Sequence, residues 1–376
     1  MPGFEIINNK EKKAINKLFS EGGVLFAHGF DKLRKNFYVR NLEKNCSKYF
    51  KTKYALAVSS GTAAIKIALK ALDVKPGDEV LTQSFNFIAT VEAIKDVGAK
   101  AIIVNVDKNL NISIDDLKKK ITKKTKVLIP VHMLGESGEF KKIIQICKKK
   151  KIKIIEDNCE SVGAKYKNKY LGTIGDIGVF SFDHGKIITT GEGGLITTNN
   201  IKYYNFCRAY HDHGHKNLKN VSRGNDKFMT VGFNYRMTEM QAVVGIEQLK
   251  KLNFILKENK KRYLSFINII KKNFEIRKIV KFSKPNFDTA IFFIKNNKQK
   301  RKILKIIKKN NFGTKNLPDA LRWHCSYYWK HMFSSREIKN MYSTQKILLK
   351  SIAIPILLNK KTSDYYKLAK DISKNN

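Results

Sequence analysis

The stretch Gly178-Val-Phe-Ser-Phe-Asp-His-Gly-Lys-Ile-Ile-Thr-Thr-Gly-Glu-Gly-Gly194 decides both the expected fold and the expected chemistry of this chain. Its apolar start predicts a short buried strand, and the polar turn after that strand presents one lysine, Lys186. In a chain with 74 Lys and Arg residues, a lysine is normally a solvated charge. Lys186 differs because Ser181 and His184 precede it and a glycine-rich return follows it.

A lysine held at the end of a strand can be desolvated enough to act as an amine nucleophile or to form a Schiff base. The glycines would let the backbone approach a flat ligand without obstruction by side chains. Lys186 is therefore predicted to be a reactive amine, and the pattern suggests pyridoxal phosphate (PLP) as its ligand.

A second informative segment, Lys151-Ile-Lys-Ile-Ile-Glu-Asp-Asn-Cys-Glu160, is a β-branched strand that ends in two carboxylates, Glu156 and Asp157. PLP needs one carboxylate against its ring nitrogen, so that the protonated ring can act as an electron sink. An open α/β sheet places such groups at the carboxyl ends of its strands. Taken alone, Asp157 is more simply explained as a helix cap. Together with the lysine segment, it is predicted to be the partner of the ring nitrogen.

A third segment, Tyr54-Ala-Leu-Ala-Val-Ser-Ser-Gly-Thr-Ala-Ala-Ile-Lys-Ile-Ala-Leu69, predicts a strand, a turn of small residues and a helix that begins near Thr62. The first N–H groups of a helix are unpaired and carry a partial positive charge. Ser60, Gly61 and Thr62 are therefore predicted to form a phosphate cradle, although this pattern on its own is also a common helix cap.

In combination, these segments resemble the DegT/DnrJ/StrS family of PLP-dependent sugar aminotransferases, which have fold type I. The resemblance covers roughly residues 55 to 250 in the family's order. It implies an α/β protein with a mostly parallel sheet in a large PLP-binding domain, residues 1–250 with an N-terminal arm. A small α+β domain, residues 251–376, would follow. The motifs are Ser59-Ser-Gly-Thr-Ala-Ala64, Pro76-Gly-Asp-Glu-Val80, Val131-His-Met-Leu-Gly135, Glu156-Asp157, residues 172–194 and Asn234-Tyr-Arg-Met-Thr-Glu-Met-Gln-Ala242.

The resemblance implies a catalytic role for two residues. Lys186 would carry the cofactor as an internal aldimine and move protons, and Asp157 would pair with the pyridine nitrogen. Phe87 matches the aromatic residue that stacks on the cofactor ring. The reaction would transfer an amino group from L-glutamate to a keto-sugar.

The phosphate of the cofactor would be held by residues of both subunits. Gly61, Thr62 and Ser181 match the contacts within one chain, and Asn234 matches a residue that reaches the phosphate from the partner subunit. The resemblance therefore implies a homodimer.

Two positions depart from the family pattern. Position 160 is usually Gln or His, and here it is Glu160, a carboxylate that would repel the phenolic oxygen of the cofactor unless it is protonated or paired. Glu160 is predicted to lie near the cofactor, with no defined role. The turn before the lysine reads Asp183-His184-Gly185, where many relatives carry an aromatic residue and a proline. A related set of sugar dehydratases replaces the catalytic lysine with His, so Lys186 favours amino transfer.

Apolar runs and helical patterns alternate along the first part of the chain, which predicts a parallel sheet covered by helices. Beyond Met237 one long amphipathic helical stretch to about Ile270 is expected, and then a smaller region. The expected strands are Tyr54–Val58, Glu79–Leu81, Ala101–Val106, Val127–Val131, Lys153–Ile155, Val179–Phe182, Leu195–Thr198 and Thr289–Ile294. The expected helices include Thr62–Leu72, Ile88–Val97, Phe140–Lys150, Gln299–Lys309 and Ser363–Ile372.

The formal net charge of +42 suggests polyanions such as nucleic acid as partners. The lysines are nevertheless scattered through nearly every expected helix, and no stacking platform of aromatics and arginines is present, so nucleic-acid binding is not expected. Five cysteines without a CxxC pair fit a reduced, cytoplasmic location. No signal peptide is recognisable, and no apolar run approaches the ~18 residues of a membrane span.

Two further clusters could contact the substrate. The segment Tyr210-His-Asp-His-Gly-His215 could hold zinc as a strand, but Gly214 indicates a loop, so His213 and His215 are predicted to contact substrate or phosphate and no metal is expected. The cluster Trp323-His-Cys-Ser-Tyr-Tyr-Trp329-Lys-His331 could be a domain core or a substrate wall. Candidate substrate contacts are His184, His213, His215, Trp323 and His324.

Within the family, the chain most resembles the 8-amino-3,8-dideoxy-octulosonate transaminases, which act on a sugar acid destined for lipopolysaccharide. The features are the opening Met1-Pro-Gly-Phe-Glu5, the segment Asp212-His-Gly-His215 and the tryptophan–histidine cluster. The alternative is a nucleotide-linked 4-keto- or 3-keto-sugar aminotransferase. A sugar dehydratase that retains the lysine, and a regulator that binds the cofactor without turnover, are the remaining alternatives.

Overall fold

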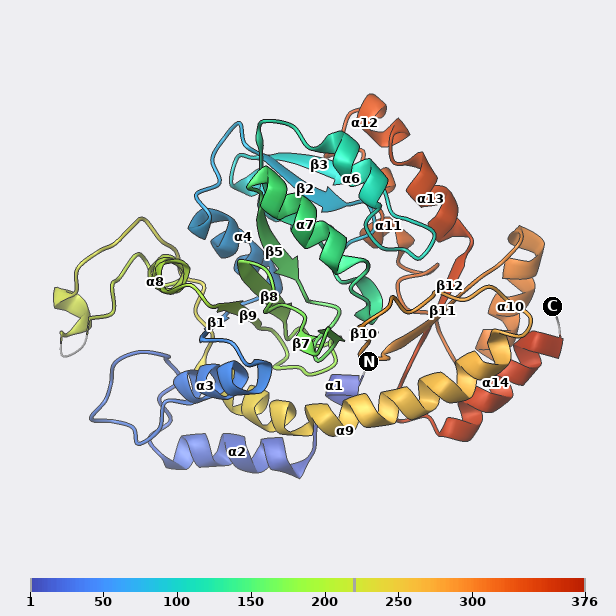
Figure 1. The fold of residues 1–376 in the computed structure, drawn as a ribbon. Coiled ribbons are helices and arrows are strands. Elements are labelled where there is room, and N and C mark those ends of the chain that lie inside the picture. Colours follow the sequence, from blue (N-terminus) through green and yellow to red (C-terminus); the bar gives the residue numbers. More distant parts are fainter. Residues whose placement is uncertain (1, 219–220, 375–376) are drawn as a thin grey trace.

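The computed structural model describes residues 2–218 and 221–374. Its centre is a seven-stranded sheet in the order β1-β9-β8-β5-β4-β2-β3 (Figure 1). β9 runs antiparallel to both of its neighbours, whereas the other neighbouring pairs are parallel. The predicted mostly parallel α/β sheet is therefore confirmed. The strands are β1 (Tyr54–Val58), β2 (Glu79–Gln83), β3 (Lys100–Val104), β4 (Thr125–Ile129), β5 (Lys153–Asp157), β8 (Ile177–Ser181) and β9 (Gly194–Thr198).

The strand ends expected from the sequence agree with the structure to within two residues. The clearest difference is at β4, which was expected to run to Val131 and ends at Ile129. Pro130 follows, and proline has no N–H to donate to a neighbouring strand. The apolar run continues past the end of the strand, so hydrophobicity alone overestimates its length.

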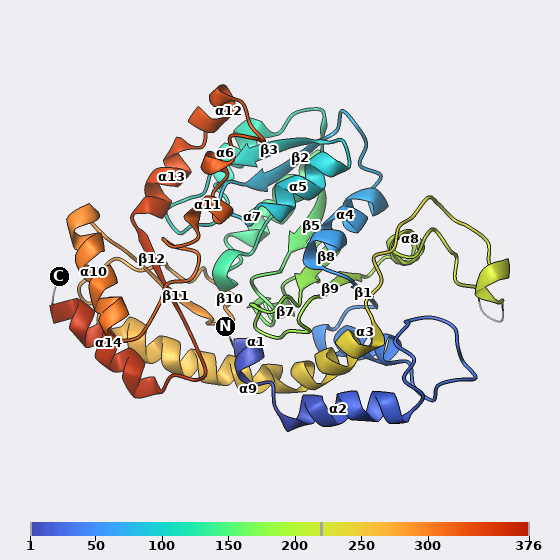
Figure 2. The same cartoon turned by 180° about the vertical axis from the view of Figure 1, so that it is seen from behind.

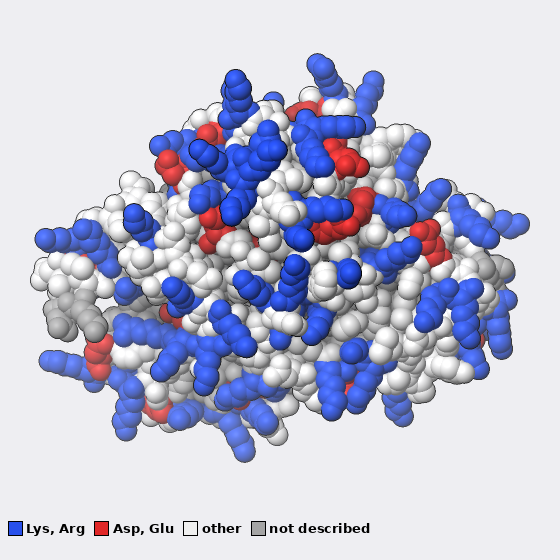
Figure 3. All heavy atoms as spheres, in the orientation of Figure 1, with Lys and Arg blue, Asp and Glu red and all other residues white. Residues whose placement is uncertain are grey.

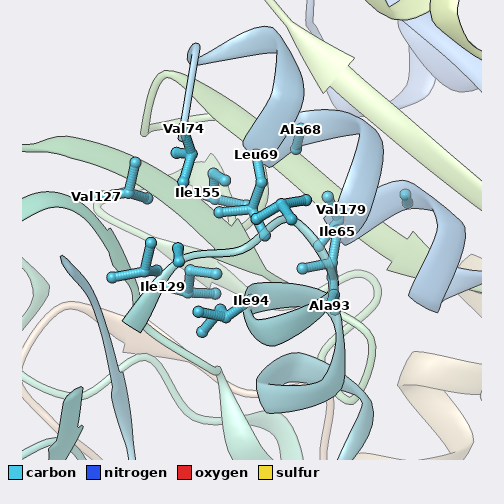
Figure 4. Packing of buried hydrophobic residues seen from close by; sticks show 14 of the residues in the cluster. Ile65, Ala68, Leu69, Val74, Ala93, Ile94, Val127, Ile129, Ile155 and Val179 are labelled. Carbon is cyan, nitrogen blue, oxygen red and sulfur yellow. The ribbon is translucent and has the colours of Figure 1, made fainter. Parts of the chain in front are cut away.

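Alternation along the strands gives the sheet two apolar faces, which Figures 1 and 2 show from opposite sides. On β5, Ile155 packs into one buried cluster and Ile154 into another. Figure 4 shows Leu69 beside Ile155, and Ile65 beside Val179, in the first cluster. Helices α4 (Gly61–Ala71), α5 (Ala89–Asp96) and α8 (Ile201–Tyr210) cover this face, and α3 (Tyr38–Phe50), α6 (Ile114–Lys120) and α7 (Phe140–Lys150) cover the other.

One long helix, α9 (Glu239–Ile270), runs along one side of the molecule from α3 to α14 and matches the helical stretch expected from the sequence (Figure 1). A capping box between Thr238 and Gln241 fixes its start. Its first half packs against α3 and α2 (Asn9–Ser20), and its second half packs against α14 (Thr362–Lys374). The expected domain boundary near residue 250 lies inside this continuous helix, and the division into two domains stays a prediction.

The C-terminal part is built on an antiparallel pair, β11 (Thr289–Phe293) and β12 (Ser351–Pro355). A second small sheet joins β6 (Lys165–Tyr166), β7 (Lys169–Tyr170) and β10 (Ser283–Lys284), and so connects this part to the loop after β5. The remaining helices are α1 (Pro2–Glu5), α10 (Asn297–Lys309), α11 (Leu321–His324), α12 (Ser335–Lys339), α13 (Tyr342–Leu349) and the 3-10 turns Met133–Gly135, Arg223–Asn225 and Ser326–Tyr328.

Lysine and arginine side chains cover the face shown in Figure 3 and are spread over it, with few acidic side chains among them. This distribution agrees with the expectation that the charge occupies solvated helix faces. Among the described residues, no helix is both long enough and apolar enough to cross a bilayer.

Candidate active site

A cavity of about 370 Å³ opens at the carboxyl ends of the parallel strands. This is the edge at which an open α/β sheet binds its ligands. Its walls come mainly from the segments after β1, β2, β4, β5 and β8, and from two residues of the C-terminal part. The lining includes Ser60, Gly61, Thr62, Phe87, Thr90, Asp157, Glu160, Ser181, Lys186, Asn316 and His324.

Lys186 reaches this cavity from a tight turn after β8. Its backbone N–H donates to the Asp183 carbonyl at 3.0 Å, and the Asp183 carboxylate accepts the Gly185 N–H at 2.9 Å. The Lys186 ammonium donates to Glu160 Oε1 at 2.8 Å. Burial lowers the pKa of Lys186, but the Glu160 carboxylate more than offsets this and holds the pKa above its ordinary value. The Lys186 amine is therefore protonated in this arrangement, and it becomes a nucleophile only when it loses that proton.

Asp157 is the last residue of β5 and is almost fully buried, with an exposure of 3%. Its Oδ2 accepts the Thr90 hydroxyl at 3.0 Å, and its Oδ1 accepts the Cys159 N–H at 3.1 Å. These two donors fix the carboxylate at the cavity wall. Thr90 was not found in the sequence, because an isolated threonine in a helical pattern gives no local signal.

Glu156, the neighbouring carboxylate, does not line the cavity. Successive residues of a strand face opposite sides of the sheet. The Glu156 carboxylate accepts the backbone N–H groups of residues 172, 174 and 175, at 2.9, 2.5 and 2.6 Å, and pairs with His132 Nε2 at 3.1 Å. Glu156 thus holds a loop in place, and Asp157 is the carboxylate available to a ligand.

The expected phosphate cradle lies at the start of α4. Ser60 caps the helix by accepting the Ala63 N–H at 3.1 Å. Gly61 and Thr62 occupy the first helical positions, whose N–H groups have no partner within the helix. A Cβ on Gly61 would lie 2.9 Å from Ser181 Cβ, so the absence of a side chain lets β8 approach the cradle closely.

The glycine-rich return after Lys186 has a different role from the one expected. A Cβ on Gly194 would lie 2.3 Å from the Ser60 carbonyl oxygen, and a Cβ on Gly193 would lie 2.8 Å from Met237 Cε. Gly194 therefore allows β9 to pack against the cradle, and Gly193 leaves no space for a side chain beside Met237. Gly191 has a φ of +82° and serves the turn itself.

Glu160 is held between two lysines. In addition to Lys186, the Lys315 ammonium lies 3.3 Å from Glu160 Oε2 and 2.7 Å from Asp288 Oδ2. Burial raises the pKa of Glu160, but Lys186 and then Lys315 outweigh it and hold this pKa well below its ordinary range. The carboxylate is therefore ionised and paired, which answers the concern that an unpaired Glu160 would repel a nearby oxyanion. Lys315 was not identified from the sequence.

An aromatic edge borders the cavity. Phe87 is 43% exposed, and its ring centroid lies 6.3 Å from that of Trp323 and 5.4 Å from that of His324. His324 Nδ1 donates to the Ala320 carbonyl at 2.8 Å. Trp329, in contrast, is 2% exposed within the core. The cluster therefore divides between the two explanations left open by the sequence: Trp323 and His324 lie at the cavity edge, and Trp329 lies in the core.

Five expected contacts do not line this cavity in the single chain; one is Trp323, beside Phe87 at its edge, and the other four lie further away. His184 is exposed and stacks on Phe4 at 4.8 Å, although it is only two residues from Lys186. Asn234 and His213 are exposed, and His215 lies 3.7 Å from an oxygen of Asp226. Within the described residues, no group of three or more His, Cys, Asp or Glu side chains is placed to hold a metal ion.

The loop that carries Asn234 is held together by Asp212, which is fully buried and pairs with Arg223 and Arg236. Large apolar side chains on the same loop are exposed, among them Phe228 at 66% and Val231 at 78%. Figure 1 shows this segment extending away from the body of the molecule beyond α8.

The residues around the cavity fit PLP. A helix start with free N–H groups and the Ser181 hydroxyl suit a phosphate, Asp157 suits a protonated ring nitrogen, and Lys186 suits the aldehyde carbon. The Ser181 oxygen accepts the Asp183 N–H at 3.3 Å, which leaves the hydroxyl proton free to donate.

Comparison with known proteins agrees with this chemistry. Residues 27–372 match the model of the DegT/DnrJ/EryC1/StrS aminotransferase family. The chain is 35% identical over 268 residues to a GDP-perosamine synthase of Escherichia coli O157:H7, an alignment that covers 71% of this chain and 69% of the relative. A curated relative is thus matched over about two thirds of its length.

Solved structures share the whole fold. An aminotransferase from Psychrobacter cryohalolentis superimposes with a TM-score of 0.87 at 24% identity, covering 98% of both chains. A GDP-4-keto-6-deoxymannose-3-dehydratase (ColD) mutant with bound GDP-perosamine gives a TM-score of 0.80 at 25% identity, again covering 98% of both chains. Structures of this fold are known in both the PLP form and the PMP form.

Proposed function

Because the chain belongs to the DegT/DnrJ/EryC1/StrS aminotransferase family and is a PLP-dependent sugar aminotransferase, we propose that its acceptor is a nucleotide-linked keto-sugar. We further propose that L-glutamate is the amino donor. The single observation that carries the catalytic assignment is the convergence of Lys186, Asp157 and the start of α4 on one cavity.

The nucleotide-linked acceptor is supported by the relatives. The E. coli relative is named for GDP-perosamine, and the dehydratase of the same fold binds GDP-perosamine. These findings favour the nucleotide-sugar alternative over the octulosonate substrate that the finer resemblance suggested, and the octulosonate assignment has no support among them. A location in the cytoplasm and a role in surface polysaccharide or lipopolysaccharide synthesis belong to the same proposal.

A sugar dehydratase is the second candidate, because a dehydratase shares the fold and is 25% identical to this chain. The presence of Lys186 favours an aminotransferase over a dehydratase. An amine at this position can take a proton from the donor and can also hold the cofactor covalently, both of which amino transfer requires. The proposal therefore depends on Lys186 as the reactive group.

The cofactor, when bound, supplies the electron sink for the reaction. Lys186 Nζ accepts the proton from Cα of the donor and returns a proton in the second half of the reaction. Asp157 supplies the anion that keeps the pyridine nitrogen protonated, and Thr90 holds that carboxylate in place. Gly61, Thr62 and Ser181 bind the phosphate, and Phe87 packs on the ring. A water molecule consumed in the first half of the reaction supplies the keto oxygen of 2-oxoglutarate. The amino group then moves to the sugar carbonyl, whose oxygen leaves as water, so no net water is formed.

The donor and the proposed acceptor are both anions, which suits a chain of net charge +42. A positive surface raises the rate at which anionic ligands are captured, and this effect weakens as salt is added. Trp323 and His324 at the cavity edge are proposed contacts of the acceptor, whereas His184 is a weaker candidate because it stacks on Phe4.

We also propose that the active unit is a homodimer. Asn234 is exposed on a loop with several exposed apolar side chains, so a second copy that covers this loop could bring Asn234 to a cofactor phosphate. His213 and His215 on the same loop would then approach the partner's cavity.

The direct test is amino transfer in solution. Holoenzyme is incubated with L-glutamate and either GDP-4-keto-6-deoxymannose or an 8-oxo-octulosonate, and the products are identified by mass. A GDP-amino-sugar together with an equal amount of 2-oxoglutarate supports the proposal. A deoxygenated keto-sugar without a retained nitrogen would instead identify a dehydratase, and an amino-octulosonate would overturn the nucleotide-linked acceptor.

A further inference from the structure

Lys315 is a second buried lysine; it does not line the cavity itself but pairs with Glu160, which does, and its part in the reaction has not been assigned. Its side chain is 5% exposed and lies in the segment between α10 and α11. An isolated buried ammonium is strongly destabilising, so such a group needs carboxylate partners. Lys315 has two, Asp288 at 2.7 Å and Glu160 at 3.3 Å.

The position of Lys315 is fixed from the C-terminal part of the chain. Its backbone N–H donates to the Ala353 carbonyl on β12 at 2.9 Å, and its carbonyl accepts the Leu317 N–H at 2.7 Å. From the same part, the Asn286 side-chain amide donates to the Glu160 carbonyl at 3.2 Å. The C-terminal part thus holds Glu160 through both its carboxylate and its backbone.

Lys315 is the cation that remains beside Glu160 when Lys186 is used for chemistry. The other groups near the two lysines and Glu160 are Cys159 and Asp183 from the turns after β5 and β8, Asp157 at the end of β5, and His324 from α11. Burial raises the pKa of the Cys159 thiol and lowers the pKa of His324, so Cys159 adds no anion and His324 adds no cation near neutral pH. Among the described residues, Lys186 and Lys315 form the ion pairs of Glu160.

The charges of this cluster are balanced only when both lysines are protonated. Lys186 and Lys315 then face Glu160 and Asp288, two cations against two anions. When Lys186 becomes a neutral amine, the cluster carries one excess negative charge. Without Lys315 it would carry two, and the neutral amine would be correspondingly harder to form.

We propose that Lys315 is a positioning residue for the amino transfer, which holds the Glu160 carboxylate beside Lys186 and compensates its charge while the Lys186 amine is unprotonated. This inference rests on the proposed function, because it concerns the amine that takes the donor's proton. The pairing with Lys315 also explains how a carboxylate is accommodated at position 160. Gln or His at this position would carry no negative charge to repel the phenolic oxygen of the cofactor.

The test measures the amine directly in protein from which cofactor has been removed. Trace labelling with acetic anhydride at a series of pH values reports the unprotonated fraction of Lys186, quantified by mass on its peptide. In Lys315→Met, the label on Lys186 at a fixed pH near neutrality should fall about tenfold, because one neighbouring like charge is gone. Lys315→Arg keeps the charge and should stay within about twofold of the wild type. Lys300→Met is the matched control, since Lys300 donates to the Leu349 carbonyl, whereas the ion pairs with Glu160 and Asp288 are made by Lys315.

A double variant separates charge from structure. Lys315→Met with Asp288→Asn removes one charge of each sign and leaves no unpaired carboxylate at 288, so the labelling should recover most of the way to the wild type. If Lys315→Met alone does not fold, Lys315→Gln takes its place, because an uncharged amide can still donate to Asp288. In the holoenzyme, the acid limb of the pH profile of the donor half-reaction should move to higher pH in Lys315→Met and not in Lys315→Arg.

Unchanged labelling of Lys186 in folded Lys315→Met would overturn the inference, as would a double variant labelled as weakly as the single one. The labelling does not require turnover. An enzyme that aminates no keto-sugar would contradict the proposed function alone, whereas normal amination with unchanged labelling would contradict the role of Lys315 alone.

Discussion

Asp157→Asn should slow the reaction severely while leaving the fold intact. The amide has the shape of the carboxylate, so its oxygen can still accept the Cys159 N–H, and the Thr90 hydroxyl can turn to accept from the new NH₂ group. With both contacts kept, the free energy of unfolding should change by less than about 1 kcal/mol. What is lost is the negative charge that keeps the ring nitrogen protonated.

The size of the effect follows from burial. An opposite charge in direct contact shifts a pKa by about 1 to 3 units, which corresponds to about 1.4 to 4 kcal/mol. Asp157 is 3% exposed, so water screens this interaction little and the upper half of the range is expected. The donor half-reaction should therefore slow by about 100- to 1,000-fold. Stopped-flow absorbance of the bound cofactor after mixing with glutamate measures this rate, and thermal unfolding measures stability.

Glu156→Gln is the matched control, because it makes the same change from carboxylate to amide one residue away. Glu156 accepts three backbone N–H groups and pairs with His132, so an NH₂ group in place of one oxygen would face donors. We expect a loss of stability of about 1 to 3 kcal/mol and a smaller loss of rate. A near-normal half-reaction in Asp157→Asn, with a slow one in folded Glu156→Gln, would refute the assignment.

Three further results are expected. Lys186→Ala should bind pyridoxamine phosphate but not turn over, and borohydride should fix the cofactor of the wild type to the Lys186 peptide; label on a different peptide would contradict this. Mixed Lys186→Ala and Asn234→Asp subunits, each inactive alone, should regain part of the activity, and no gain despite subunit exchange would refute a shared site. Trp323→Ala should raise KM for the acceptor while the donor half-reaction keeps its rate, because the exposed ring lies at the cavity edge; a slowed donor half-reaction would place it elsewhere.

The position of the cavity could be predicted from the sequence, because the segments that line it follow strands of a parallel sheet. The segments with Gly61, Asp157 and Lys186 each follow a predicted strand, and the carboxyl ends of parallel strands meet at one edge. Strand alternation could also have separated Glu156 from Asp157, once the strand was placed. The catalytic roles of these residues stay predictions until the variants are measured.

Contacts between distant segments could not be predicted in this way. Thr90 reaches Asp157 across 67 positions of sequence, and neither residue's neighbours indicate the pairing. β12 was missed because Ser351-Ile-Ala-Ile-Pro355 is a short apolar run, for which a strand and a buried helix turn look alike. His184 was judged by its closeness to Lys186 in sequence, but the turn directs its ring onto Phe4.

Glu160 shows why a departure from a family pattern has to be judged with its surroundings. In the sequence it was an anomaly, a carboxylate where repulsion was expected, and its compensating charge lies 155 positions further on, at Lys315. The two positions act as one electrostatic unit, because Glu160→Gln alone would leave Lys315 with Asp288 as its carboxylate partner and remove the anion that holds Lys186 charged. We therefore expect the neutral amine of Lys186 to form more readily in Glu160→Gln, opposite in sign to Lys315→Met. The same labelling of the Lys186 peptide measures both, and equal signs for the two variants would show that packing, and not charge, governs this amine.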